Sequence, residues 1–258
     1  MKTCLFGAAA VLMTTGLASA SIVNEDFESY ADTAGLGGVW SLGDGTLDTG
    51  FGNPGQSMSH PGTGGSFTGA NTNSLSFGSV YPGAGEVLVF SADIYDDAAN
   101  ANRRNTAGLR AAAGANIIEM GMYNSPSHYA IRTVLFGAGS DGSWVAFDNM
   151  VDDAGDPLVN APVQGWHTFR AEITDSQVVF TLDLNGDGNI NGTHVASIVQ
   201  NAAFGFDIVR LGGPSDLGSG LNGGVSFDNV LLEVVPEPGT AALALAGLSA
   251  LGLRRRSA

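Results

Sequence analysis

The sequence predicts an all-β fold for residues 21–235, namely an antiparallel β-sandwich of two sheets. Runs of five to ten residues rich in β-branched and aromatic side chains recur along this stretch, and Gly, Asn, Asp or Pro bounds each run. The runs follow no repeat period, and helical patterns are scarce between the two termini. About 215 residues can form one large core, in which two stacked sheets bury the apolar half of each strand.

The N-terminus has the three regions of a secretory signal peptide. A lysine precedes an apolar run over residues 4–17, and small residues follow it at positions 18–20. A buried N-terminal helix is the alternative, but the run has no amphipathic period. We therefore expect residues 1–20 to be removed by cleavage after Ala20.

Residues 35–85 differ in composition from the rest of the domain. They hold many glycines and few large apolar side chains. A disordered linker and an arm of irregular loops lying on the sandwich are both compatible with this composition. The flanking sequence DFESY and Trp40 favour the arm.

Two central runs show the clearest strand pattern. His167, Phe169, Ala171 and Ile173 share one face of the first run, and Val178, Phe180 and Leu182 share one face of the second. The short connection at residues 175–176 predicts a hairpin. In all we expect eleven strands, at Ser74–Phe77, Glu86–Tyr95, Thr106–Ala112, Asn116–Tyr123, His128–Phe136, Ser143–Phe147, Trp166–Thr174, Gln177–Asp183, His194–Gln200, Phe206–Leu211 and Val225–Val234.

The last residues, 236–258, form three parts that differ from the acidic domain. Pro236, Glu237 and Pro238 open a motif that ends at residue 239, an apolar run spans 240–253, and a basic tail spans 254–258. Fourteen helical residues rise roughly 21 Å, short of the ~30 Å hydrocarbon core, which predicts a marginal membrane span. The arginines of the tail should stay on the cytoplasmic side and leave the domain outside.

This C-terminal arrangement resembles the PEP-CTERM sorting signal of Gram-negative bacteria. The resemblance implies that an exosortase recognises the signal in the membrane and cuts near the motif. The protein would then be anchored in the inner membrane by residues 240–253 and afterwards reach the cell surface or extracellular matrix. A C-terminal core helix is the alternative, and it leaves the three arginines unexplained.

Three patches of the domain resemble concanavalin-A-like jelly-roll domains of secreted bacterial proteins. They are Asn24–Trp40, Gly165–Thr193 and Val225–Val235. The resemblance implies that the last strand, which contains FDNV, closes a sheet beside the N-terminal strand. That fold hosts lectin-like modules, glycan hydrolases, lyases and structural domains, so function has to come from the site.

Charge and cysteine content exclude several classes of function. All 25 acidic residues lie between Glu25 and Glu237, where there are six arginines and no lysine, a net charge of 6 − 25 = −19. Such a surface repels phosphates, so we expect no nucleic-acid partner. The single cysteine, Cys4, lies in the signal peptide, which excludes thiolate catalysis and Cys-ligated zinc in the mature chain. Divalent cations and neutral glycans stay open as ligands.

Oxygen-bearing side chains recur in the stretch that follows Gln177–Asp183. Asp183, Asn185, Asp187, Asn189 and Asn191 alternate there, and Gly188 supplies a bend, as in an EF-hand-like calcium loop. His194 stands where a bidentate carboxylate belongs, which predicts weak affinity. The same residues also suit a metal-free hairpin turn, so both interpretations stay open.

A second calcium site could join the two ends of the domain. In jelly-roll modules, carboxylates of an N-terminal strand, here Glu25, Asp26 and Glu28, can share calcium with an acid of the last strand, here Asp228. Solvent-facing acids on edge strands, which discourage sheet-to-sheet association, are the alternative.

Catalytic motifs are missing from the sequence. Retaining glycosidases need two carboxylates about 5 Å apart, but Glu119 and Glu172 each stand alone, and the Asp pairs at 96–97 and 152–153 are adjacent in loops. The four histidines are scattered without metal-ligand spacing, and His167 is best explained as a strand residue. We expect a protein that is not an enzyme.

Seven aromatic residues could stack on sugar rings if they lie on a sheet face: Trp40, Trp144, Trp166, Tyr81, Tyr95, Tyr123 and Tyr129. For Trp166 we expect core packing instead. The sequence therefore favours an exported surface protein with a structural or weakly glycan-binding sandwich, with or without calcium. A glycan-active hydrolase or lyase on a jelly-roll scaffold is the alternative.

Overall fold

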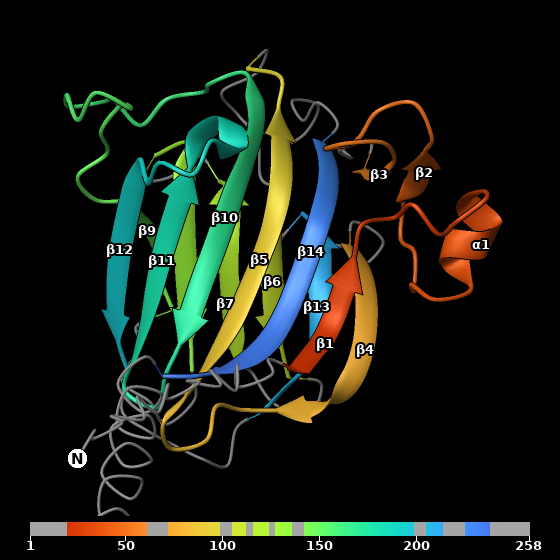
Figure 1. Cartoon of the computed structure of the whole chain (residues 1–258), viewed down its shortest axis with the longest axis horizontal. Helices are drawn as coiled ribbons and strands as arrows, with labels where there is room; N and C mark the ends of the chain where they lie inside the picture. The colour runs from red at the N-terminus through yellow and green to blue at the C-terminus, as the bar shows by residue number, and fades with distance from the viewer. Residues whose placement is uncertain are drawn as a thin grey trace, which may run out of the picture.

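Two antiparallel β-sheets form the domain (Figure 1). The computed structural model describes residues 20–60, 72–98, 105–111, 116–123, 127–135, 142–198, 205–213 and 225–237. The predicted signal peptide, apart from residue 20, the apolar run 240–253 and the tail 254–258 lie outside these residues.

The first sheet, here sheet A, has eight strands in the order β12-β11-β10-β5-β14-β3-β2, and β1 also pairs with β14. The last strand thus lies between β5 on one side and both β1 and β3 on the other. This confirms that the FDNV strand lies beside the N-terminal strand. The strands of sheet A are β1 (Ala20–Glu25), β2 (Thr46–Asp48), β3 (Ser57–His60), β5 (Glu86–Asp96), β10 (Gly165–Ile173), β11 (Gln177–Asp183), β12 (Gly192–Ser197) and β14 (Val225–Pro236).

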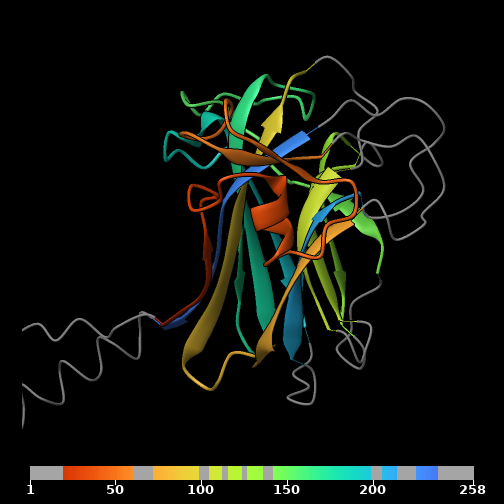
Figure 2. The ribbon, with the colours of Figure 1, turned by 90° about the vertical axis from the view of Figure 1, so that its right-hand side faces the viewer.

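The second sheet, here sheet B, has the order β4-β13-β6-β7-β8-β9. Its strands are β4 (Thr72–Val80), β6 (Asn105–Arg110), β7 (Ile117–Met122), β8 (Tyr129–Val134), β9 (Trp144–Ala146) and β13 (Phe206–Gly212). Figure 2 shows the two sheets stacked face to face.

The core lies between the inner faces of these sheets. Along β10 every second residue from His167 to Ile173 is buried, and the residues between them are half-buried on the outer face. Phe90, Phe169 and Phe180 from sheet A meet Met120 and Ile131 from sheet B in one apolar cluster. This alternation confirms the predicted sandwich, because each strand buries one face and leaves the other toward solvent.

All eleven strands expected from the sequence are present within a few residues of their predicted ends. The predicted hairpin is formed by β10 and β11, which pair antiparallel from Thr168↔Asp183 to Ile173↔Val178. The N-terminal strand β1 was implied by the resemblance, whereas β2 and β3 were not expected. These two strands have three and four residues and lack a run of β-branched side chains, so tertiary pairing makes them strands: β3 pairs with β14, and β2 pairs with β3.

Residues 26–60 form an arm on one edge of the sandwich (Figure 1). Helix α1 (Thr33–Gly37) begins after Asp32, whose side chain accepts a hydrogen bond from the Gly35 amide. Leu36 and Trp40 are buried and join the core cluster. The described part of residues 35–85 therefore carries the end of α1, two short strands and all of β4, and this part is more regular than its composition suggests.

Candidate functional site

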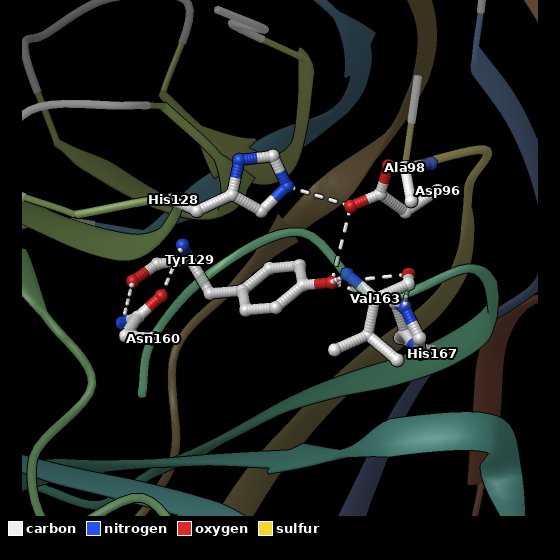
Figure 3. Close-up of polar contacts among 7 residues, drawn as sticks. All are labelled: Asp96, Ala98, His128, Tyr129, Asn160, Val163 and His167. Carbon is white, nitrogen blue, oxygen red and sulfur yellow. Dashed lines mark hydrogen bonds and ion pairs between the residues drawn. The ribbon is translucent and has the colours of Figure 1, made fainter. Parts of the chain in front are cut away.

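A buried polar network joins the two sheets at one end of the sandwich (Figure 3). It contains Asp96 at the end of β5, His128 and Tyr129 at the start of β8, and His167 on β10, all buried. Asp96 Oδ2 lies 2.6 Å from His128 Nε2 and accepts a hydrogen bond from the Tyr129 hydroxyl at 3.1 Å. The Tyr129 hydroxyl in turn accepts from the amide of Val163 at 3.0 Å.

The partners of His167 define its tautomer. The Asn185 amide donates to Nδ1 at 3.1 Å, so the proton is on Nε2, which donates to the Val163 carbonyl at 2.7 Å. Burial lowers the pKa of His167 and keeps the ring neutral. This agrees with the expectation that His167 is a strand residue.

Asp96 remains ionised inside this network. Burial alone would raise its pKa, but the hydrogen bonds from His128 and from the Ala98 amide outweigh that effect and lower it. Burial, together with the charge of Asp96, raises the pKa of Tyr129. The network connects β5, β8, β10 and two loops, and its groups face the interior, so it has the geometry of a structural connection between the sheets.

The predicted calcium loop forms a tight turn that includes the 3₁₀ segment η1 (Leu184–Gly186). Asp183 accepts hydrogen bonds from the amides of Asp187 and Gly188 at 3.1 and 2.8 Å. Asn189 donates to Asp187 through its amide and side chain. Asn185 adopts a positive φ of 70°, a left-handed conformation that asparagine tolerates better than most residues.

Asn191 of the predicted calcium loop already has hydrogen-bond partners within the protein. The Asn191 Oδ1 atom accepts a hydrogen bond from the Leu184 amide, and its Nδ2 donates to Asp153 at 3.0 Å. Burial raises the pKa of Asp183, with the charges of Asp187 and Asp93 adding to it. In this structure the side chains are therefore engaged with the loop and its neighbours, and calcium at this loop stays a prediction.

The acids of the second predicted calcium site have separate partners. Glu25 accepts hydrogen bonds from Trp40 Nε1 and the Tyr30 hydroxyl, which tie β1 to the arm. Asp26 is exposed and accepts from the Glu28 amide at 3.1 Å. Asp228 is buried on β14. Among the described residues there is no group of three or more His, Cys, Asp or Glu side chains that could hold a metal ion.

Asp228 lies opposite Asp93 of β5, and both hold the turn of the arm at Asn53. Asp228 accepts hydrogen bonds from the amides of Asn53 and Asn229. Asp93 accepts from the side chains of Asn53, Asn229 and Thr168 at 3.0, 2.8 and 2.6 Å. These contacts form a lock, here called the Asn53 lock, between the arm and the outer face of sheet A.

Asp93 and Asp228, the two carboxylates of the Asn53 lock, are neighbours in the structure although they lie far apart in the sequence. Burial raises the pKa of Asp228 to about 6, with Asp93 and Glu28 contributing. Both aspartates are buried beneath the arm and saturated with N–H and O–H donors. They are therefore poorly placed for a substrate, although a pair of neighbouring acids is what a glycosidase requires.

Three aromatic rings form a cluster beside this lock, on the outer face of sheet A. Trp166 and Tyr95 are directly opposite on β10 and β5, with ring centroids 5.4 Å apart. Phe51 of the arm stacks on Trp166 at 5.4 Å and contacts Tyr95 edge-on at 4.7 Å. Phe51 is 38% exposed, and the other two rings are half-buried.

The prediction that Trp166 packs in the core was wrong. Strand alternation puts Phe169 and Ala171 inside, so Trp166 has to lie outside. Trp40 and Tyr129, by contrast, are buried, and they are excluded from sugar stacking. Phe51 was not among the candidates, because nothing in its glycine-rich surroundings marks it as part of a cluster.

A row of charged and aromatic residues crosses the outer face of sheet B. The strand register aligns Arg210, Gly108, Glu119, Arg132 and Trp144 on β13, β6, β7, β8 and β9. Four inter-strand gaps of about 4.8 Å give the row a length of ~19 Å. Glu119, which the sequence leaves without a second carboxylate, pairs with Arg110 and lies 3.7 Å from Arg132.

The charge of Arg110 also acts on Arg210 across this face. Burial, followed by the charge of Arg110, lowers the pKa of Arg210 to about 10. Beside the arginines, Tyr123 and Trp144 stack nearly parallel, with centroids 3.9 Å apart and an angle of 11°. Strand alternation puts each of these side chains on the outer face of sheet B. That alternation is the feature of the sequence that could have predicted that they share a face.

Within the described part of the chain, no helix is long and apolar enough to cross a bilayer. Pro236 ends β14, and the Glu237 amide donates to the Gly85 carbonyl at 2.9 Å. The sorting motif therefore begins where the sandwich ends.

Comparison with known proteins confirms the C-terminal motif. Residues 234–257 match the PEP-CTERM protein-sorting motif, a stretch that contains Pro236, Glu237 and Pro238. None of the curated proteins compared with the chain matches its sequence.

The structural neighbours include glycosidases and lectins at low identity. An endo-1,3-beta-glucanase from Streptomyces sioyaensis is 16% identical with a TM-score of 0.46, and the match covers 89% of this chain and 100% of that one. A lectin from Bauhinia forficata in complex with GalNAc is 9% identical with a TM-score of 0.43, covering 85% and 99%. A structure from a study of endo-acting O-glycanases of the human gut microbiota is 13% identical with a TM-score of 0.47, covering 84% and 100%. The chain is a two-sheet antiparallel β-sandwich that carries a PEP-CTERM sorting motif.

Proposed function

We propose that the protein is an exported, exosortase-processed surface or extracellular-matrix protein whose sandwich binds glycans weakly and has no enzymatic activity. The sorting motif at residues 234–257 supports the route. The aromatic cluster of Phe51, Tyr95 and Trp166 is the observation that carries the binding function.

Its rings suit the apolar face of a sugar. They lie on the outer face of sheet A, partly exposed, directly beside the polar groups of the Asn53 lock. Flat aromatic surfaces next to hydrogen-bonding side chains are the common means of holding a neutral sugar ring. Because the acids Asp93 and Asp228 are buried and fully hydrogen-bonded, the same geometry favours binding over hydrolysis.

A neutral-glycan array with the exported protein tests this proposal. We expect Trp166→Ala and Phe51→Ala to weaken binding of the best ligand by about tenfold, which corresponds to one lost side-chain contact. Val159→Ala is the control, because Val159 is 78% exposed and is not one of the three residues whose rings contact one another in the cluster. Binding that survives both aromatic substitutions, or release of reducing ends from the bound glycan, would contradict the proposal.

A further inference from the structure

The outer face of sheet B holds two arginines against one carboxylate. Glu119 is only 2% exposed, whereas the side chains of Arg110 and Arg132 are 23% and 27% exposed. Glu119 thus lies beneath the two guanidinium groups and fixes both. Its side chain has room there because residue 108 is glycine: a Cβ at Gly108 would lie 2.9 Å from Glu119 Cγ.

The charges of Arg110, Arg132 and Glu119 do not balance. The two guanidinium groups share the single carboxylate of Glu119. Arg110 Nε and Glu119 Oε2 are both buried atoms without a hydrogen-bond partner. An arginine that is partly removed from water without its own counter-charge costs free energy, and a bound carboxylate would offset that cost. This local excess stands out in a domain with a net charge of −19.

An aromatic surface adjoins Arg132. Trp144 is directly opposite Arg132 across β8 and β9, and Tyr123 stacks on it. Both rings are half-buried and lie on the outer face of the sheet. Arginine recognises carboxylates through paired N–H donors, and an indole face suits the C–H surface of a pyranose.

We propose that Arg110, Arg132 and Trp144 form a binding site for a carboxylated sugar, with the uronate group on the arginines and the ring against Trp144. Glu119 is a positioning residue that holds the two arginines. This site is on the opposite sheet from the Phe51–Tyr95–Trp166 cluster, so the two proposals succeed or fail separately.

Calorimetric titration of the exported protein with trigalacturonate tests the site, and the methyl ester of the same trisaccharide is the matched neutral ligand. We expect the ester, Arg110→Gln and Arg132→Gln each to lower the affinity about tenfold, as expected for a lost charged hydrogen bond. Arg170→Gln should have no effect, because Arg170 lies on sheet A and pairs with Glu172. Equal binding of the acid and its ester, no binding at millimolar ligand, or an Arg170→Gln effect as large as the other two would overturn the proposal.

Two further variants separate a sugar site from a general anion site and from simple charge attraction. Trp144→Ala should weaken trigalacturonate but leave any binding of acetate unchanged; an equal loss for both ligands contradicts the role of Trp144. Glu119→Gln removes one negative charge and makes the site more positive, but it also removes the carboxylate that holds the arginines. The affinity for trigalacturonate should therefore fall. A rise in affinity would show that charge alone attracts the ligand and would overturn the positioning role of Glu119.

Discussion

Among single residues, His167 and Asp96 make the fold sensitive to acid. The pKa of His167 is lowered from 6.5, so below pH 6.5 the unfolded chain binds a proton that the folded protein does not. Stability is therefore lost as the pH falls from 6.5 toward the folded pKa. Asp96, whose pKa is lowered from 3.8, adds a loss at more acidic pH. Asp228, with a pKa of about 6, acts in the opposite direction between pH 6 and 3.8.

His167→Gln tests this assignment. Glutamine can still donate to the Val163 carbonyl but takes up no proton, so the variant should be less stable at pH 7.5 and lose less on acidification. The measurement is the melting temperature at pH 7.5 and at pH 5.0. If the wild type and the variant lose the same number of degrees between the two conditions, His167 is not the source of the acid sensitivity.

Among the elements, those with a strong local pattern could be predicted and those made by tertiary pairing could not. The hairpin of β10 and β11 follows from alternation in its own residues, whereas β3 exists because the edge of β14 pairs with it, and β2 because it pairs with β3. The same limit applies to the sites. Asp93 and Asp228 are 135 residues apart in sequence, and only the register of β5 with β14 makes them neighbours. Arg110, Glu119 and Arg132 lie on β6, β7 and β8, and only the order and register of sheet B make them neighbours.

Removal of Asp93 should release the arm from sheet A. Asp93→Ala leaves the side chains of Asn53, Asn229 and Thr168 without their acceptor, at a cost of about 1–3 kcal/mol in the free energy of unfolding. Urea unfolding measures that cost, and limited proteolysis should show faster cleavage within residues 49–56. Asp26→Ala is the control, because Asp26 is exposed and accepts only the Glu28 amide among the described contacts. Equal cleavage of the two variants would contradict the role of the Asn53 lock.

The whole molecule combines a sorting motif with a sandwich that exposes two different outer faces. Sheet A carries the aromatic cluster and the acids of the Asn53 lock, and sheet B carries the arginine group. The last strand, β14, contacts β5, β1 and β3, and it leads directly into Pro236 and Glu237. Cleavage near the motif would therefore leave the central strand of sheet A intact, and the exported domain would keep its fold.

The most direct measurement of this account is the mass of the full chain after expression with an exosortase in an exporting host. We expect the mature protein to begin near Ser21, to end close to Pro236 or Glu237, and to lack the three arginines of the tail. Substitution of Pro236 and Glu237 by alanine should leave the uncut form in the membrane fraction. A wild-type protein that retains residues 240–258 in the presence of the exosortase would contradict the account.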